Sequence, residues 1–319
     1  PGSKRGSKPE SRIERILVIR GGGLGDFVLI LPVLAALQHH WPKAELQLLC
    51  NPEMGNLALS RGYACSVHSI HDSGIAALFS DHSPDKLPGY IQDIDLAISF
   101  LGDPSGQLEE NLRRLASQVL IVPPPEENRT HAASQFLRSL EAIGIYSEEH
   151  LPHLKHSPHA RAVVSEALPS LFADSAAPPI AVHPGSGSAS KNWNAAGFAE
   201  TIFRLGDRLG FSTLVVTGEA DTEARQKLQL ELGGVLPYEL HRESLEMLAS
   251  TLQCCMMLIG NDSGVSHLAA ALDIPVLAIF GPTLPTVWRP LGSKVKVLGF
   301  KEASPNRLEE EARKLLQLQ

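Results

Sequence analysis

Short apolar runs alternate with longer amphipathic stretches along most of the chain. Residues 15–20 (RILVIR) form a β-branched run, and a glycine-rich segment at 21–26 separates this run from an apolar stretch that continues to Leu37. This order predicts a strand, a tight loop and a helix. Pro32 lies inside the expected helix and should kink it, because proline cannot donate the backbone hydrogen bond of a helix interior.

The same alternation continues to the last third of the chain. Further strands are predicted at 45–50, 95–100, 180–183, 212–217, 256–259 and 276–280, and helices at 195–209, 221–232, 244–254 and 263–272. Strands that alternate with helices predict a mostly parallel sheet covered on both faces. The predicted fold class is therefore α/β, with two doubly wound domains.

The length and a change in composition set the expected domain division. A chain of 319 residues has room for two domains of about 150 residues each. Residues 151–179 are rich in Pro, His, Ser and Ala, which is typical of a connection between domains. We predict a tail or cloning remnant at 1–12, a first domain at 13–170, a second domain at 171–302, and a terminal helix at 303–319 that Ser304 caps.

Charge and cysteine content exclude several classes of protein. The net charge of -7 argues against a dedicated nucleic-acid-binding protein, which would need basic side chains to neutralise phosphates. The apolar runs are shorter than the ~20 residues of a membrane span. The four cysteines include an adjacent pair and no CxxC, which indicates neither a zinc site nor a disulfide framework. We expect a cytoplasmic protein.

The segment 260–267 (GNDSGVSH) follows a predicted strand and opens a predicted helix. Ligands bind at the carboxyl ends of parallel strands, and the free N–H groups of a helix start receive phosphate well. Ser263 adds a hydroxyl, and His267 lies one turn further on. An equally simple interpretation is that Asp262 or Ser263 caps the helix and that His267 belongs to the core.

A second loop of this kind lies at 183–193 (HPGSGSASKNW). Its small residues allow close backbone approach, its serines supply hydroxyls, and Lys191 supplies a cation. The presence of two such loops in one domain indicates a diphosphate ligand more strongly than either loop would alone. The alternative is that Lys191 is an ordinary surface lysine.

The loop at 21–26 (GGGLGD) differs from a dinucleotide-binding fingerprint, because position 26 carries Asp where GxGxxG needs Gly. This difference weakens the interpretation as an NAD-dependent oxidoreductase. Asp26 at a helix start either satisfies the helix dipole or, if it faces a cleft between domains, can act as a general base.

Three blocks of the chain resemble a known family. They are 16–37 (ILVIRGGGLGDFVLILPVLAAL), 181–198 (AVHPGSGSASKNWNAAGF) and 258–290 (LIGNDSGVSHLAAALDIPVLAIFGPTLPTVWRP). In this order and spacing they resemble the bacterial ADP-heptose:lipopolysaccharide heptosyltransferases, glycosyltransferase family nine. The resemblance implies the GT-B fold: two Rossmann-like domains facing a cleft, with the acceptor in the first, the donor in the second, and a final helix that crosses back.

The resemblance also implies roles for individual residues. Asp26 matches the catalytic base that deprotonates the acceptor hydroxyl. The positions that match donor-binding residues are Ser186, Ser188, Lys191, Glu219, Asp262, Ser263, Gly264 and His267, and the candidates for acceptor contact are Gly23, Arg129 and His131. Glu219 is expected to hold the nucleoside.

These roles describe an inverting transfer that needs neither a metal nor a cofactor. A base acts on one face of the anomeric carbon, while a lysine, hydroxyls and a helix N-terminus stabilise the departing diphosphate on the other. The expected partners are a nucleotide-sugar donor and a glycolipid or oligosaccharide acceptor. We expect a monomer in the cytoplasm, with peripheral association at the inner membrane.

One segment departs from the family pattern. Residues 101–107 (LGDPSGQ) lack the basic side chains that family members usually bring toward an anionic acceptor, so the sequence leaves the acceptor unassigned. Two alternatives to the transferase remain at this point: a protein that binds a nucleotide sugar without transferring it, and a GT-B enzyme for another nucleotide sugar. A UDP-sugar epimerase would usually need additional carboxylates in the cleft.

Overall fold

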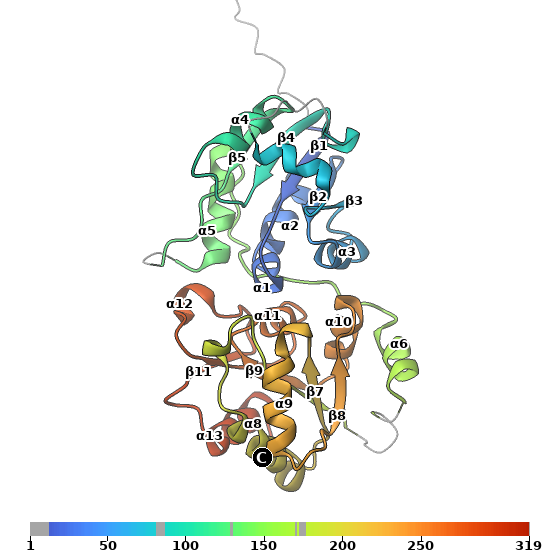
Figure 1. Cartoon of the computed structure of the whole chain (residues 1–319), viewed down its shortest axis with the longest axis vertical. Helices are drawn as coiled ribbons and strands as arrows, with labels where there is room; N and C mark the ends of the chain where they lie inside the picture. The colour runs from blue at the N-terminus through green and yellow to red at the C-terminus, as the bar shows by residue number, and fades with distance from the viewer. Residues whose placement is uncertain (1–12, 81–86, 128–129, 170, 172–176, 319) are drawn as a thin grey trace, which may run out of the picture.

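A computed structural model shows two α/β domains, one above the other, joined along a narrow junction (Figure 1). The structure describes residues 13–80, 87–127, 130–169, 171 and 177–318. The predicted tail at 1–12 lies outside these residues. The predicted fold class, with two parallel sheets each flanked by helices, is confirmed.

The first domain is built on a five-stranded parallel sheet in the order β3-β2-β1-β4-β5. Its strands are β1 (Arg15–Ile19), β2 (Glu45–Cys50), β3 (Ser66–Ser69), β4 (Ile94–Ser99) and β5 (Ala116–Ile121). Its helices are α1 (Leu24–Val28), α2 (Leu31–His40), α3 (Pro52–Ser60), α4 (Gln107–Arg113) and α5 (Ala132–Arg138), with 3-10 turns η1 (Ser73–Phe79), η3 (Gly89–Ile91) and η4 (Ser139–Ile143). In central β1 nearly every side chain is buried, because helices cover both faces of the sheet.

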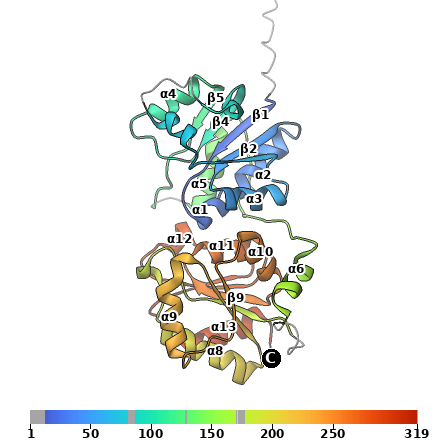
Figure 2. The ribbon, with the colours of Figure 1, turned by 45° about the vertical axis from the view of Figure 1, so that its right-hand side comes forward.

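The second domain holds a six-stranded parallel sheet in the order β11-β10-β9-β6-β7-β8. Its strands are β6 (Ile180–His183), β7 (Thr213–Thr217), β8 (Tyr238–His241), β9 (Met257–Asn261), β10 (Val276–Phe280) and β11 (Val295–Gly299). Its helices are α6 (Ala160–Ala167), α8 (Ala195–Leu209), α9 (Thr222–Glu231), α10 (Leu245–Gln253), α11 (Gly264–Ala271), α12 (Pro285–Trp288) and α13 (Pro305–Leu315), with 3-10 turns η5 (Ala189–Lys191) and η6 (Glu219–Asp221). Helices α10, α11 and α12 line the side of this domain that faces α1 (Figure 2).

The kinked helix predicted around Pro32 is instead two helices. Helix α1 ends at Val28, and α2 begins at Leu31 with Pro32 in its first turn. A proline is tolerated there because the first N–H groups of a helix have no partner within it. The break leaves α1 as a short helix that carries Asp26 to the domain junction.

The terminal helix does not cross back to the first domain, contrary to the prediction. Ser304 caps α13 as expected, but α13 packs on α8 and β10 of the second domain. Leu308 and Ala312 are buried in that domain's core, and Glu309 forms ion pairs with Arg204 and Arg208 of α8. Its apolar face is thus already used at the far end of the second domain (Figure 1).

The connection between the domains lies at the start of the Pro-rich segment 151–179, earlier than the boundary predicted at residue 170. Helix α6 was assigned to the first domain, but it packs against α10 of the second. Before it, the N–H of Leu154 donates to the Ala271 carbonyl at 2.7 Å, and the ring Nε2 of His156 lies 2.7 Å from the Leu272 carbonyl oxygen. The chain therefore reaches the second domain by residue 154. The boundary predicted at residue 170 falls on a residue outside those the structure describes.

Candidate active site between the two domains

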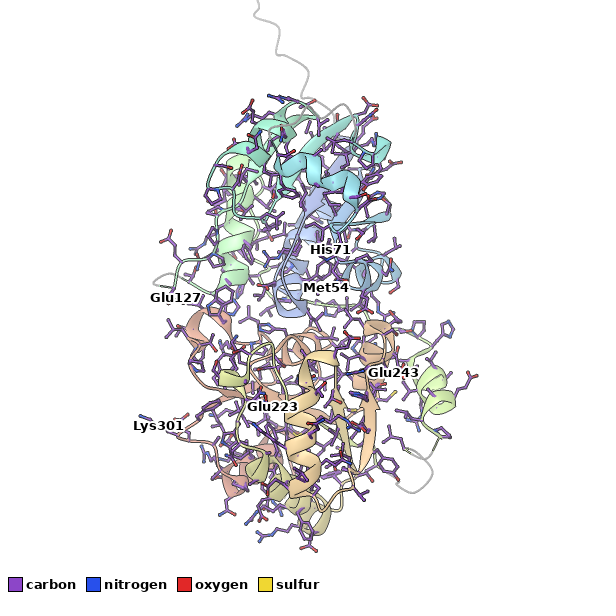
Figure 3. The ribbon with its side chains drawn as sticks, viewed as in Figure 1. Met54, His71, Glu127, Glu223, Glu243 and Lys301 are labelled. Carbon is purple, nitrogen blue, oxygen red and sulfur yellow. The ribbon has the colours of Figure 1, made fainter. Side chains whose placement is uncertain are left out.

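A cavity of about 820 Å³ lies between the facing edges of the two sheets. The first domain contributes α1 and Glu53, and the second contributes the loops that follow β6, β7, β8, β9 and β10. In each sheet the strand order reverses beside the cavity, between β1 and β4 and between β6 and β9. Ligands of doubly wound sheets bind at such switch points. Met54 of α3 and Glu243 mark facing sides of the junction (Figure 3).

Helix α1 places Asp26 at the cavity with both carboxylate oxygens partnered. The Gly23 N–H donates to Oδ2 at 3.0 Å, and Nη2 of Arg20 lies 3.1 Å from Oδ1. The Asp26 side chain is still 42% exposed, so it remains accessible from the cavity. A carboxylate oriented in this way can accept a proton from a bound hydroxyl group.

Glycines let α1 of the first domain touch α11 of the second. A Cβ added to Gly264 would lie 2.7 Å from the Leu24 Cβ and 2.8 Å from the Gly25 nitrogen. A Cβ on Gly25 would in turn lie 3.3 Å from the His267 ring. The Asp26 helix and the start of α11 are therefore in direct contact across the junction.

The serine-rich loop after β6 is fixed by a buried amide. Asn261, at the end of β9, donates from Nδ2 to the Pro184 carbonyl at 2.8 Å and accepts from the Trp193 N–H at 2.9 Å. Within the loop, Oγ of Ser186 lies 2.6 Å from the Ser188 carbonyl oxygen. Asn261 thus attaches both ends of the loop to the neighbouring strand, which places Ser186 and Lys191 at the cavity.

Lys191 and Asp262 meet across the two loops. Nζ of Lys191 lies 2.9 Å from Oδ2 of Asp262, and the Thr283 hydroxyl donates to the same oxygen. The Asp262 side chain is only 5% exposed, whereas that of Lys191 is 32% exposed. The lysine is therefore the partner that can turn toward an anion in the cavity.

Helix α11 opens as expected. Ser263 is its N-cap, and its hydroxyl accepts from the Ser266 N–H. The N–H groups of Gly264 and Val265 fall in the first turn, where a helix offers them no internal partner. His267 follows on the same helix, is buried, and lines the cavity. Its Nδ1 has no hydrogen-bond partner among the described residues.

Burial keeps His267 neutral. Desolvation lowers the pKa of His267 to about 4, although the carboxylates of Asp262 and Asp26 act in the opposite direction. The His267 ring lies against Gly25 of the first domain, where an added Cβ would be 3.3 Å away, so it stands at the junction of the two sides of the site. A neutral imidazole can donate from one ring nitrogen and accept at the other.

The buried histidine predicts a specific loss of stability in acid. An unfolded chain takes up a proton on this histidine near pH 6.5, whereas the folded chain does so only near pH 4. The unfolded state therefore binds more protons between these values, and the free energy of unfolding falls as pH decreases through this window. We expect His267 to account for about 2 kcal/mol of the loss between pH 7.5 and 5. Urea unfolding of the wild type and His267→Gln at both pH values measures it; an equal loss in both proteins would contradict it.

The position of the Asp221 side chain explains why residue 185 in the serine-rich loop is a glycine. Its Oδ2 accepts from the Gly218 N–H at 2.7 Å, and its side chain is buried against Gly185. A Cβ on Gly185 would lie only 1.8 Å from the Asp221 Oδ1. The loops after β6 and β7 can therefore approach each other only with glycine at position 185.

Adding one methyl group at this contact should destabilise the second domain. We expect Gly185→Ala to lower the free energy of unfolding by about 1–3 kcal/mol, as overpacking of a tight site does. Gly187→Ala is the matched control, because a Cβ at Gly187 has no neighbour within 4 Å. Urea titration of both variants tests this; equal stabilities for the two would contradict the contact.

Glu219 lies at the rim of the cavity. It is exposed in η6, directly after β7. Apolar side chains from the same region line the neighbouring wall: Val216, Leu240, Leu245 and Leu248. An apolar wall beside an exposed carboxylate suits a nucleoside, whose base is flat and weakly polar and whose ribose carries hydroxyl groups.

The three candidate residues for acceptor contact differ in where they lie relative to the cavity. Gly23 lines the cavity, whereas Arg129 lies outside the described residues. In His131, Nδ1 accepts from the Ala133 N–H at 3.2 Å, so Nε2 donates to the Arg289 carbonyl at 2.8 Å. Burial lowers the pKa of His131, which agrees with this neutral ring. His131 therefore links α5 to the second domain and is not among the residues that line the cavity, and its role as an acceptor contact stays a prediction.

Four site residues were missed from the sequence: Arg20, Asn261, Asp221 and Thr283. Each lies at or just beyond the carboxyl end of a predicted strand, which is the one pattern that could have indicated them. Ser188 was predicted, and its hydroxyl lies 2.9 Å from that of Ser190 on the exposed side of the loop. Ser188 does not line the cavity, unlike Ser186.

Neither a metal-binding cluster nor a membrane-spanning helix occurs among the described residues. No cluster of three or more His, Cys, Asp or Glu side chains suited to a metal ion occurs among them. Within the same residues, every helix is too short or too polar to cross a bilayer.

Comparisons with known proteins agree with this architecture. Two solved structures share the fold: the glycosyl transferase family 9 protein of Veillonella parvula (TM-score 0.76, 19% identity, 95% of this chain and 97% of that one) and the ADP-heptose lps heptosyltransferase II of E. coli (TM-score 0.74, 20% identity, 95% and 98%). These similarities define the GT-B class of two-domain folds.

A family model fixes the family. The model described as glycosyltransferase family 9 (heptosyltransferase) matches residues 109–316, more than half of the chain. The chain therefore belongs to glycosyltransferase family 9, as its sequence motifs predicted. The lipopolysaccharide heptosyltransferase 1 of Pseudomonas aeruginosa is 36% identical over 116 residues, which are 35% of this chain and 31% of that protein. The alignment thus spans about a third of that relative's length.

Proposed function

We propose that this protein transfers a heptose from ADP-heptose to a lipopolysaccharide core or related glycan acceptor, with inversion and without a metal ion. The observation that carries the proposal is the pairing of groups across one cavity. Asp26 lies on the first domain, and Lys191 with the start of α11 lies on the second. The similarity to the ADP-heptose lps heptosyltransferase II of E. coli supports the choice of ADP-heptose as the donor in this proposal.

In this proposal the second domain binds the nucleotide sugar. The adenine ring of the nucleotide lies against the wall that includes Val216 and Leu240, and the ribose hydroxyls donate to Glu219. The diphosphate lies at the N-terminus of α11, where the Ser263 region supplies N–H groups and a hydroxyl. Lys191 turns from Asp262 to the diphosphate.

The transfer itself is a single displacement at the anomeric carbon. The acceptor hydroxyl loses its proton to Asp26 while its oxygen forms the new bond to the sugar. The bond from the anomeric carbon to the diphosphate oxygen breaks, and ADP leaves with the electron pair. Lys191 and the α11 N–H groups stabilise the charge that develops on ADP, at roughly 3 kcal/mol for each well-placed donor.

In this proposal, His267 forms a hydrogen bond to the bound donor. Its Nδ1 is buried at the cavity and unpartnered in the described part of the chain, so a polar group of the nucleotide sugar would satisfy it.

Since an acceptor carried on a lipid would lie at a membrane surface, we also propose a peripheral position at the cytoplasmic face of the inner membrane.

A thermal-shift comparison tests the donor. ADP, UDP, GDP and their sugar derivatives are added to the protein, and the ligand that binds most tightly raises Tm most. We expect ADP-heptose to give the largest shift and ADP the next. A larger shift with UDP-sugars would contradict the ADP-heptose assignment and leave the fold unchanged.

A further inference from the structure

Arg20 follows the central strand β1 and is buried beside the cavity. Its backbone N–H continues the sheet by donating to the Leu49 carbonyl at 2.9 Å, and only 8% of the residue is exposed. An arginine is rarely buried unless its guanidinium group is paired with acceptors or with an opposite charge. The contacts of this group therefore indicate what it does.

The guanidinium group bonds to Asp26 twice. Nη2 lies 3.1 Å from the Asp26 Oδ1, and Nε donates to the Asp26 carbonyl oxygen at 3.2 Å. One residue thus holds both the side chain and the backbone of Asp26. The planar fork of arginine makes this double contact possible, whereas a lysine ammonium group has no such fork.

Other chain segments hold the guanidinium group in place. Nη1 donates to the Phe100 carbonyl at 3.2 Å, just beyond β4. The guanidinium carbon lies 5.0 Å from the centre of the Phe136 ring and 5.9 Å from that of Phe100. These two rings pack edge to face, so the arginine has little freedom to move.

The same contacts distinguish the two oxygens of the carboxylate. Arg20 bonds to Oδ1, while Oδ2 accepts from the Gly23 N–H at 3.0 Å. The carboxylate therefore has one orientation. Burial lowers the pKa of Arg20, whereas the neighbouring Asp26 charge raises it. The negative charge of Asp26 therefore favours the charged form of the buried guanidinium group.

We propose that Arg20 is the positioning residue for Asp26: it fixes the carboxylate so that Oδ2 receives the proton of the acceptor hydroxyl. This inference rests on the proposed function, in which Asp26 is the base. Arg20 itself exchanges no proton and contacts no substrate. In the step it serves, the acceptor O–H bond breaks, the proton goes to Oδ2, and the oxygen bonds to the anomeric carbon as ADP leaves.

The test is a double-mutant cycle of kcat with ADP-heptose and truncated lipopolysaccharide that lacks its heptose residues. We expect Arg20→Met to reduce kcat about 10- to 100-fold, as small misplacements of a catalytic group do, and to change the KM for ADP-heptose less than twofold. Arg20→Lys should recover part of the loss, because it restores the charge but not both hydrogen bonds. Arg204→Met is the matched control, since Arg204 forms ion pairs far from the cavity.

The decisive comparison uses Asp26→Asn as the background. If Arg20 acts through Asp26, adding Arg20→Met to Asp26→Asn should change the residual kcat less than twofold. A further loss of 10-fold or more would overturn the proposal, since Arg20 would then act on the substrate or on the whole fold. Full activity of Asp26→Asn alone would instead overturn the base role in the proposed function.

Chemical rescue provides a second, independent measurement. Arg20→Ala removes the guanidinium group from its place beside the Phe100 and Phe136 rings. We expect guanidinium chloride at low millimolar concentration to restore part of kcat with saturation, and sodium chloride at equal ionic strength to restore none. Rescue that is absent while Tm equals that of the wild type would contradict the positioning role.

Discussion

Replacing Asp26 by Asn should reduce kcat about 100- to 10,000-fold, the usual contribution of a general base. Asparagine keeps the size of the side chain and one oxygen that can accept from the Gly23 N–H or face Arg20, but it cannot take up the proton. Binding of ADP should be unchanged, because the groups proposed to bind the nucleotide lie on the second domain. Steady-state kinetics and calorimetric titration with ADP measure the two effects separately.

A control separates this effect from a general loss of acidic charge. Glu141→Gln removes an exposed carboxylate from the same domain, outside the cavity, and should leave kcat within twofold of the wild type. Normal turnover by Asp26→Asn would contradict the base assignment. A wild type that binds ADP-heptose but releases no ADP with any acceptor tested would favour a binding protein over a transferase.

Replacing Lys191 by Ala should weaken ADP binding roughly 10- to 100-fold, because hydrogen bonds to charged groups contribute about 1.5–3 kcal/mol. The loss has a second cause. Lys191 pairs with Asp262, so its removal leaves a buried carboxylate beside the proposed diphosphate site, with Thr283 still donating to it. Transfer should also slow, because the lysine is proposed to stabilise the leaving group. Calorimetry with ADP and steady-state kinetics measure both effects.

Lys294→Ala is the matched control for this variant. Lys294 also pairs with an aspartate at 2.9 Å, Asp273, but both side chains are half exposed and lie away from the cavity. Exposed pairs contribute little, so ADP affinity and Tm should be nearly unchanged. Equal ADP affinity in Lys191→Ala and the wild type would contradict the phosphate role.

The sequence predicted the central strands well because their neighbours impose a continuous apolar pattern. Strands β2, β6 and β10 have the predicted bounds, and β1 ends one residue earlier than predicted. The edge strands were missed. Strand β3 (SVHS) and strand β8 (YELH) carry mostly polar side chains, since each pairs on one side only and is partly exposed.

Tertiary packing accounts for the two errors in helix placement. Pro32 suits the first turn of a helix as well as a kink, and only the position of the neighbouring elements decides between them. The apolar face of α13 was visible in the sequence, but nothing in the sequence showed that α8 would cover it. The expected crossing back came from the family resemblance and not from the residues.

The site loops were predictable for a topological reason, whereas their partners were not. Loops that follow adjacent parallel strands must meet at one edge, so Lys191 and Asp262 could be placed near a common cleft, whereas Asp26 was placed there by the family resemblance. The bonds that orient them join distant positions. Asn261 holds a carbonyl 77 residues away, and Arg20 reaches one 80 residues away. No local pattern encodes such contacts.

Analysis of the reaction products tests directly whether this protein is an inverting heptosyltransferase. The purified protein is incubated with ADP-heptose and truncated lipopolysaccharide, and the products are analysed by mass spectrometry and by NMR of the new anomeric centre. We expect one ADP to be released for each heptose added, with the anomeric configuration inverted and with the rate unaffected by EDTA. A product with retained configuration, or transfer from UDP-sugars but not from ADP-heptose, would contradict it.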